Sequence, residues 1–412
     1  MFEIVPPVQP LSGSVTLPGS KSITNRALLL AALAAGESQI TGALKSDDTK
    51  FMVEGLRKLG IKIAEPDETT FVVQGRGGKL TESPEPLFLG NAGTATRFLA
   101  AAASLVIGET VITGNERMNK RPIEDLTSAL AQLGVKVETN EGCTPVKIIS
   151  TGKLTGQVVK IRGNVSSQFV SALLMLLPNA AEEIRLELEG ELTSKGYVDI
   201  TTAVMAGFGV IPLASNNGFK IPHKTYSATN FAVEPDASSA TYFWAAEKLL
   251  GQTIMLTNVP QVWIQPDAES RQLMIKFPEP FGTVDGSRFP DAVVTLAVLA
   301  AFANGQTRFT NIANLRVKEC DRIVAIATEL NRIKPDLAEE DGDDLVIHGD
   351  RDLVKHGKPT EITTYGDHRI AMAFALVGLK VPGIKITNPA CVSKSFPDYF
   401  ETLENLGVTI KK

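Results

Sequence analysis

The chain has 412 residues, of which 43% are hydrophobic, and it carries a formal net charge of -5. That length exceeds what one hydrophobic core usually covers, so two lobes are expected. The acidic balance argues against a protein that binds nucleic acid through a broad basic face. The longest apolar runs, at 27–35 and 98–107, are shorter than the roughly 18 residues that span a bilayer, so no membrane segment is expected. The first 15 residues lack the basic start and apolar run of a signal peptide, and we therefore expect a cytoplasmic protein.

The cysteines and histidines show no metal-ligand spacing. Cys143, Cys320 and Cys391 are odd in number and include no C-x-x-C pair. Neither a disulfide framework nor a zinc site is therefore expected. We expect no metal and no cofactor.

Six short polar clusters rich in Gly, Ser, Asn or Asp each open directly into an apolar run of helical length. They lie at residues 20–22, 90–94, 163–167, 236–239, 291 and 366–369. The start of a helix offers backbone N–H groups without helical partners and the positive end of the helix dipole, which together attract anions. We expect several of these helix starts to converge on a strongly anionic ligand.

The repeat continues beyond each opening cluster. A short strand that ends in Thr and a small turn residue recurs at residues 41–42, 113–114, 257–258, 310–311 and 387–388. A second helical stretch follows, and four of these stretches end at a glycine suited to a left-handed cap, namely Gly60, Gly134, Gly209 and Gly407. The pattern predicts an α/β protein made of six copies of a small subdomain of roughly seventy residues, three in each lobe.

Basic residues gather beside the opening clusters although the chain is acidic overall. Lys21 and Arg26 flank Ser22, and nothing in the following apolar run offers Arg26 an acidic partner. Two cations and a hydroxyl at one helix start suit a phosphate. Alternatively, Ser22 is only the N-cap of its helix.

The next two clusters are also richer in polar groups than a helix start requires. Gly90 and Gly93 would let backbone amides approach a ligand, and Arg97 follows one turn into an apolar helix. Ser166, Ser167 and Gln168 are three hydrogen-bonding side chains where one cap is enough. The basic turn at 117–121 and the polar turn at 194–197 could by themselves be ordinary solvated loops.

Asp291 and the segment 314–322 are the candidate acid–base groups of the second half. An Asp directly before an apolar run is most often an N-cap, although a carboxylate held there can also serve as a base. Residues 316–322 contain five charges, with Lys318 and Arg322 one helical turn apart and Glu319 beside them. A solvated helix face is the alternative interpretation of that cluster.

Taken together, the motifs resemble those of the 5-enolpyruvylshikimate-3-phosphate synthase family of enolpyruvyl transferases. The resemblance runs from GSKSITNRALLLAALA at 19–34 to KSFPDYFETLENLGV at 394–408 and covers nearly the whole chain. It implies a two-lobed fold, each lobe with three βαβαββ units, and substrates bound between the lobes. The first lobe is expected at 20–229 and the second at 1–19 plus 230–412.

This resemblance also implies an activity: transfer of the enolpyruvyl group of phosphoenolpyruvate to the 5-hydroxyl of shikimate 3-phosphate, with release of phosphate. Both substrates are small molecules, and the expected protein is a monomer of the shikimate pathway, which supplies chorismate and the aromatic amino acids. The residues implied for shikimate 3-phosphate are Lys21, Ser22, Arg26, Ser166, Ser167, Gln168, Ser194, Asn314 and Lys318. Those implied for phosphoenolpyruvate are Lys21, Gly93, Arg121, Gln168, Arg322, Arg369 and Lys394. Asp291 is the implied proton acceptor, Glu319 the implied proton donor, and Lys21 a catalytic cation.

Several positions depart from the usual pattern of the family. Phe98 and Gly196 each stand where a Pro is common, Pro235 stands where a Gly is common, and Leu315 replaces a frequent Trp. The spacing from the fourth opening cluster to the fifth is also short. These changes leave the implied contact residues intact.

Three rival assignments remain. The enolpyruvyl transferase that acts on UDP-N-acetylglucosamine typically has Lys-Asn near its start and a catalytic Cys in a mobile loop, whereas this chain has Lys21-Ser22, and Cys143 lies in a turn. An RNA 3′-phosphate cyclase would need nucleotide chemistry and an active His. A non-catalytic anion-binding relative would have no need for Asp291 and Glu319.

Overall fold

A computed structural model describes residues 1–412 and divides into two compact units. The central unit is Gly19–Glu234, and the terminal unit combines Met1–Pro18 with Pro235–Lys412. Each unit has its own hydrophobic core. The central unit ends at Glu234, five residues after the boundary expected at 229. The reason is that β14 (Asn230–Ala232) pairs in parallel with β3 (Ala35–Thr41) and so belongs to the central unit.

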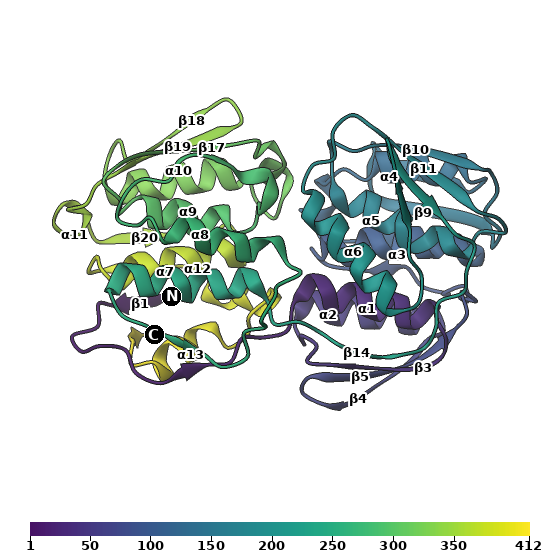
Figure 1. Ribbon diagram of the computed structural model, residues 1–412, viewed down its shortest axis with the longest axis horizontal. Helices are drawn as coiled ribbons and strands as arrows, with labels where there is room; N and C mark the ends of the chain where they lie inside the picture. Colours follow the sequence, from purple (N-terminus) through teal and green to yellow (C-terminus); the bar gives the residue numbers. More distant parts are fainter. The chain divides into compact units, whose positions relative to one another are not determined.

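Five of the six sheets share one pattern, in which a parallel outer pair is followed by two antiparallel pairs (Figure 1). Those of the central unit are, in spatial order, β14-β3-β5 (Thr70–Arg76)-β4 (Lys62–Asp67), β6 (Leu87–Phe88)-β7 (Ile107–Thr113)-β9 (Cys143–Thr151)-β8 (Lys136–Asn140), and β10 (Val158–Arg162)-β11 (Ile184–Glu189)-β13 (Gly218–Ile221)-β12 (Leu213–Ser215). The terminal unit has β16 (Gly282–Asp285)-β17 (Gly305–Thr310)-β19 (Asp344–Gly349)-β18 (Ala338–Asp341) and β20 (Thr360–Ile362)-β21 (Ile384–Ile386)-β1 (Phe2–Val5)-β22 (Thr409–Lys411). The recurrence of one strand pattern agrees with the predicted repeat of a small α/β subdomain.

The fourth copy is reduced, which the repeat did not predict. Its sheet has only two strands, β15 (Met255–Leu256) and β2 (Ser14–Val15). Residues 257–265 form bends and irregular backbone in place of further strands, and the short helix α8 (Ser270–Met274) follows. This segment is shorter than its counterparts and contains Pro260 and Pro266, which cannot donate to a strand ladder.

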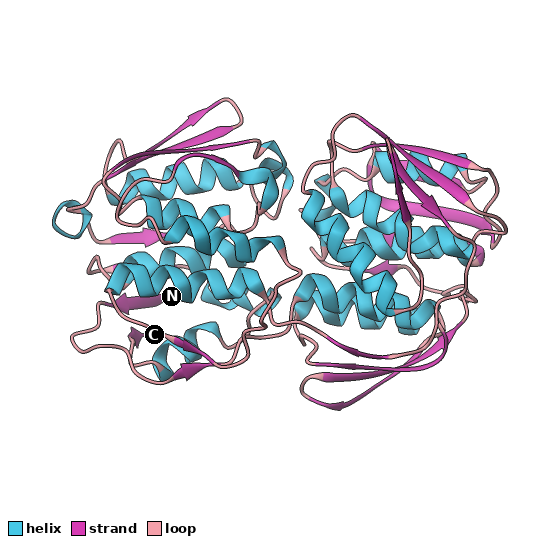
Figure 2. Ribbon diagram, in the orientation of Figure 1, coloured by secondary structure: helices cyan, strands magenta, loops and turns pink.

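The first helix of each copy is buried on nearly every side, as its continuous apolar run predicts. These helices are α1 (Lys21–Leu33), α3 (Gly93–Ala102) and α5 (Ser167–Leu176) in the central unit, and α7 (Ala237–Leu250), α9 (Val293–Ala300) and α12 (His368–Gly378) in the terminal unit. All ten residues of α3 are buried. Within each unit the helices gather together and the sheets lie outside them (Figure 2).

The second helices are more amphipathic, and their predicted glycine stops are confirmed. They are α2 (Asp47–Lys58), α4 (Glu124–Gln132) and α6 (Lys195–Gly207) in the central unit, and α10 (Arg322–Ile333) and α13 (Tyr399–Asn405) in the terminal unit, which also has the short α11 (Leu353–His356). Gly60, Gly134, Gly209 and Gly407, which follow four of these helices, all have positive φ angles. Only glycine adopts that conformation without a steric penalty, so these positions end the helices. None of the helices has the length and apolar character needed to cross a bilayer.

The core of the central unit provides a test of this packing. Leu173 on α5 is completely buried, so Leu173→Ala should lower the free energy of unfolding by about 2 to 5 kcal/mol. The matched control is Leu213→Ala on β12, where the side chain is 59% exposed and the expected change is within about 0.5 kcal/mol. Urea unfolding followed by circular dichroism measures both, and equal shifts for the two variants would contradict the assigned core.

Candidate active site

In the terminal unit, a buried arginine joins three carboxylates that come from different parts of the chain. Arg322 is the first residue of α10, and its side chain is only 1% exposed. Its Nη1 lies 2.8 Å from Asp291 Oδ1, its Nη2 lies 3.0 Å from Glu319 Oε2, and its Nε lies 2.7 Å from Asp367 Oδ2. Burial opposes the charge, but attraction by the three carboxylates outweighs burial and raises the pKa of Arg322 above its usual value.

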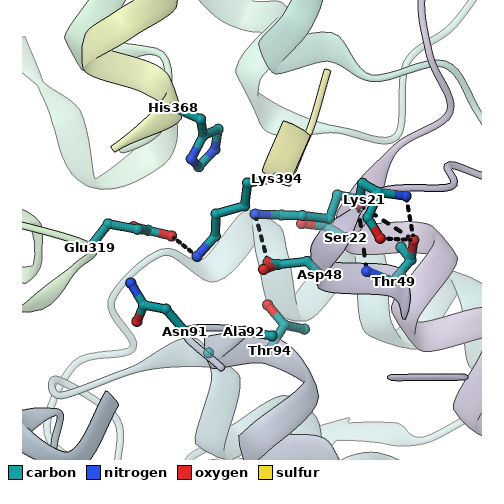
Figure 3. Close-up of polar contacts among 12 residues, drawn as sticks. Lys21, Ser22, Asp48, Thr49, Asn91, Ala92, Thr94, Glu319, His368 and Lys394 are labelled. Carbon is teal, nitrogen blue, oxygen red and sulfur yellow. Dashed lines mark hydrogen bonds and ion pairs between the residues drawn. The ribbon is translucent and has the colours of Figure 1, made fainter. Parts of the chain in front are cut away.

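Two further cations extend this network. The second oxygen of Asp291 lies 2.7 Å from Nη2 of Arg369, at the start of α12. The second oxygen of Glu319 lies 3.0 Å from Nζ of Lys394, the last residue of the 3-10 helix η7 (Pro389–Lys394), and this ion pair is drawn in Figure 3. Five residues singled out from the sequence, Asp291, Glu319, Arg322, Arg369 and Lys394, are therefore connected by direct ion pairs.

Two alternative interpretations from the sequence, Asp291 as an N-cap and the segment around Glu319 as a solvated helix face, are wrong. Helix α9 begins at Val293 with Ala292 in the N-cap position, so Asp291 is not an N-cap. Its carboxylate instead binds two guanidinium groups, which are stronger partners than backbone amides. The segment that holds Glu319 is not a solvated helix face either, because α10 begins only at Arg322, whose side chain is buried.

Asn314 and Lys318 lie on the segment that leads to Glu319. Asn314 is within the 3-10 helix η6 (Ala313–Val317), and Lys318 is its C-cap. Both side chains are half-buried. Both residues thus lie close in sequence to Glu319 and Arg322, but they belong to η6 and its cap and not to α10.

In the central unit, Arg26 is buried without a carboxylate partner. Its Nε donates to Thr201 Oγ1 at 2.7 Å, its Nη1 to the carbonyl of Ser22 at 2.8 Å, and its Nη2 to Ser171 Oγ at 3.3 Å and the carbonyl of Tyr197 at 3.1 Å. All of these acceptors are neutral. Burial accordingly lowers the pKa of Arg26 to about 10. A buried cation surrounded by neutral dipoles is a strong attractor for an anion.

Phe98 supplies the remaining contact of this guanidinium group. The ring centroid lies 5.2 Å from Cζ of Arg26, within the range of a cation–π interaction. Phe98 is completely buried on α3 and stands where the resembling family commonly has Pro. The ring therefore connects α3 with α1.

Lys21 is held at the start of α1 by an acidic residue of α2. Lys21 Nζ lies 3.2 Å from Oδ2 of Asp48, whose side chain is 5% exposed (Figure 3). Helix α1 is capped by Ser20, whose hydroxyl accepts from the backbone N–H of Ile23. The interpretation of Ser22 as the N-cap is therefore wrong, because Ser22 is the second residue of the helix.

Gly93 and Arg121 lie against each other. A Cβ atom on Gly93 would lie 2.8 Å from both Nη1 and Nη2 of Arg121, so only glycine leaves room for this guanidinium group. Nη1 of Arg121 donates to Asn91 Oδ1 at 3.2 Å. Because Gly93 is the first residue of α3, the guanidinium group lies at the amino end of that helix.

The remaining predicted residues occupy the starts of α5 and α6. Ser166 is the N-cap of α5 and accepts from the backbone N–H of Gln168, while Ser167 is buried. Gln168 Nε2 donates to Thr94 Oγ1 at 3.3 Å, which joins the starts of α5 and α3. Ser194 is the buried N-cap of α6 and has a left-handed backbone, with φ 52°.

The sequence analysis did not identify the side chains that accept hydrogen bonds or ion pairs from the basic residues of the site. Asp48 binds Lys21, Asn91 binds Arg121, and Asp367 binds Arg322. Asp367 belongs to a recognised opening cluster, and its place as the N-cap of α12 was a usable signal. The partner of Lys21 and the side-chain partners of Arg26 lie on other helices, so only the fold reveals them. No group of three or more His, Cys, Asp or Glu is arranged to hold a metal ion.

These features define a class of protein: an α/β enzyme of repeated subdomains whose helix starts gather cations and carboxylates. The model of one family, described as EPSP synthase (3-phosphoshikimate 1-carboxyvinyltransferase), matches residues 5–403. The chain therefore belongs to the EPSP synthase family, and the family predicted from the sequence motifs is confirmed.

Individual relatives agree with this assignment. The chain is 53% identical over 408 residues to the 3-phosphoshikimate 1-carboxyvinyltransferase of Rhizobium leguminosarum bv. trifolii, covering 98% of this chain and 97% of the relative. It is 48% identical over 411 residues to the enzyme of the same name from Pseudomonas savastanoi pv. phaseolicola, covering 99% and 98%. A solved structure of EPSP synthase from Acinetobacter baumannii superposes with a TM-score of 0.79 at 25% identity, covering 100% of this chain and 99% of that one. The predicted α/β fold is thus confirmed.

The contact between Gly93 and Arg121 leads to a prediction. Gly93→Ala should displace the Arg121 side chain, because the new methyl group overlaps both terminal nitrogens. Overpacking of this kind costs about 1 to 3 kcal/mol, so the KM for phosphoenolpyruvate should rise roughly tenfold. Steady-state kinetics measures it. Gly251→Ala serves as a control for lost stability, because its positive φ makes Ala unfavourable there while the new Cβ would meet nothing within 4 Å, so its KM should stay unchanged. A Gly93→Ala enzyme with an unaltered KM would show that Arg121 does not contact this substrate.

Proposed function

We propose that the chain catalyses the reaction for which its family is named, the transfer of the enolpyruvyl group of phosphoenolpyruvate to the 5-hydroxyl of shikimate 3-phosphate. One observation carries the assignment of roles. Asp291 and Glu319, the two candidate acid–base groups, are bound directly to Arg322, Arg369 and Lys394, the cations assigned to phosphoenolpyruvate. A phosphorylated acid that binds these cations is thereby placed beside both carboxylates.

The central unit supports the binding of shikimate 3-phosphate. Arg26 is desolvated and has only neutral acceptors and an aromatic ring as neighbours, so an arriving anion gains a strong interaction and displaces no carboxylate. Helices α1, α5 and α6 surround this guanidinium group with the carbonyl of Ser22 and the hydroxyls of Ser171 and Thr201. Such a set suits a ligand that carries a phosphate, a carboxylate and hydroxyl groups.

The proposed reaction proceeds by addition and elimination. The 5-hydroxyl oxygen bonds to C2 of phosphoenolpyruvate while Asp291 accepts the hydroxyl proton and Glu319 gives a proton to C3. The resulting tetrahedral ketal then loses a proton from C3 to Glu319, and the bond from C2 to the phosphate oxygen breaks. Phosphate leaves with the electron pair of that bond, and the C2–C3 double bond is restored. The proton taken up by Asp291 passes to the departing phosphate, which returns Asp291 to its starting state.

The ion pairs of Asp291 and Glu319 would couple these proton transfers to the binding of the substrate anion. Both oxygens of Asp291 accept hydrogen bonds from guanidinium groups, so a substrate anion must draw those groups away before this carboxylate can take a proton. Likewise, Glu319 binds Arg322 and Lys394 until the anion competes for them. Lys21, Arg121 and Lys394 are proposed to offset the charge that develops on the departing phosphate.

The compartment and oligomeric state are also proposed from the sequence. We propose a cytoplasmic protein, because both proposed substrates are small phosphorylated molecules of a biosynthetic pathway, and a monomer, because every residue assigned to the substrates comes from this one chain. Light scattering of the purified protein measures the oligomeric state.

The activity has a direct test. Purified protein should release phosphate from phosphoenolpyruvate only when shikimate 3-phosphate is present. A malachite green assay with each acceptor in turn compares shikimate 3-phosphate with UDP-N-acetylglucosamine. Phosphate release with the UDP-sugar, or with neither acceptor, would contradict the proposal.

The two carboxylates are tested separately from binding. Asp291→Asn and Glu319→Gln should each lower kcat by roughly 100-fold or more, because general acid–base catalysis typically contributes that much. Calorimetric titration with shikimate 3-phosphate should show that both variants still bind it. A wild-type kcat in either variant would remove that residue from the mechanism.

A further inference from the structure

Glu329 is a buried carboxylate that the proposed reaction does not use. It lies on α10, seven residues after Arg322, and is completely buried. A buried carboxylate is destabilising unless hydrogen bonds and opposite charge compensate for the lost water. The partners of Glu329 therefore indicate why the charge is kept there.

Two of those partners belong to one turn that is distant in sequence. Tyr365 Oη donates to Glu329 Oε1 at 2.8 Å, and the backbone N–H of Thr363 donates to Glu329 Oε2 at 3.1 Å. Arg332, on the same helix, donates to Oε2 at 2.8 Å and to Thr363 Oγ1 at 3.2 Å. Burial and the bond to Glu329 raise the pKa of Tyr365 to about 12, so its hydroxyl remains a donor at neutral pH.

The turn that Glu329 holds has an unusual backbone. Tyr365 and Gly366 both have left-handed conformations, with φ of 54° and 67°. Such a conformation is unfavourable for a tyrosine and persists when surrounding contacts impose it. The bonds from Glu329 to Thr363 and Tyr365 are contacts of that kind.

The same turn leads directly into the proposed phosphoenolpyruvate site. Asp367 follows Gly366, caps α12 and binds Arg322, while Arg369 binds Asp291. Residues seven apart on a helix lie on one face, about 10 Å apart along the axis. Helix α10 therefore holds the segment from Thr363 to Arg369 at two points, through Glu329 at one and Arg322 at the other.

We infer that Glu329 is a positioning residue for the phosphoenolpyruvate part of the site: its buried carboxylate fixes the turn that places Asp367 and Arg369. This inference rests on the proposed function, since it assigns Arg322 and Arg369 to that substrate. Glu329 itself is not proposed to touch either substrate or the reacting atoms.

The first experiment compares Glu329→Gln and Tyr365→Phe with the wild-type enzyme. An amide oxygen replaces only one of the two carboxylate oxygens, so at least one donor of the turn loses its acceptor in Glu329→Gln. The expected result is a KM for phosphoenolpyruvate that rises roughly tenfold in Glu329→Gln and about threefold in Tyr365→Phe. The Kd for shikimate 3-phosphate, measured by calorimetry without phosphoenolpyruvate, should stay within about twofold, because none of the hydrogen-bond partners of Glu329 is assigned to that substrate.

A matched control separates positioning from stability. Tyr226 is a buried tyrosine of the central unit whose hydroxyl donates to the carbonyl of Met175 at 2.9 Å. Tyr226→Phe removes a comparable hydrogen bond and should lower Tm without changing the KM for phosphoenolpyruvate. A lowered Tm with an unchanged KM in both Glu329→Gln and Tyr365→Phe would overturn the inference and leave Glu329 a purely structural residue. Should Glu329→Gln fail to fold, Tyr365→Phe decides alone.

The result also distinguishes this inference from the proposed function. A wild-type enzyme that releases no phosphate with shikimate 3-phosphate would refute the proposed function. An active wild type whose KM for phosphoenolpyruvate is matched by both variants would refute only the role of Glu329.

Discussion

The buried guanidinium group of Arg322 is the constraint on which the terminal unit depends. A charge with so little exposure must be compensated by partners of opposite charge, and its three carboxylates come from the residues before α9, before α10 and at the cap of α12. Removing one partner from a buried ion pair typically costs about 3 to 5 kcal/mol, so the three helix starts are strongly held together. The same contacts present Asp291 and Glu319, so stability and the proposed chemistry have one physical origin.

The cations proposed to bind the substrates have different surroundings in the two units. In the central unit, the guanidinium group of Arg26 donates to neutral acceptors and contacts the Phe98 ring, so no ion pair with a carboxylate would compete with the proposed ligand. In the terminal unit, Arg322, Arg369 and Lys394 are ion-paired with carboxylates. In the proposed mechanism, a substrate anion competes with these carboxylates for the cations, and a carboxylate released in this way becomes available for a proton. The first arrangement would favour affinity, and the second would link binding to catalysis.

The sequence predicted features that depend on local physics. Apolar runs, opening clusters and stop glycines mark helices whose ends depend on nearby residues, so the six buried helices and the positive φ of Gly60 were predictable. Features that depend on distant partners were not. Asp291 was a reasonable N-cap until Arg322 and Arg369 proved to bind it, and nothing near Glu329 in the sequence identifies Tyr365 as its partner. The reduced fourth sheet was missed because periodicity locates helices better than very short strands.

The pairing of an amino-terminal strand with two carboxyl-terminal strands affects the order in which the protein can fold during translation. Strand β1 leaves the ribosome early, but its neighbours β21 and β22 are synthesised last. The central unit, by contrast, contains all of its strands once β14 has emerged, so it can fold while the rest is still being translated. Strand β1 therefore stays unpaired until the end of translation, after the central unit has been able to fold. Its unpaired edges are the part of the nascent protein that most needs protection from aggregation.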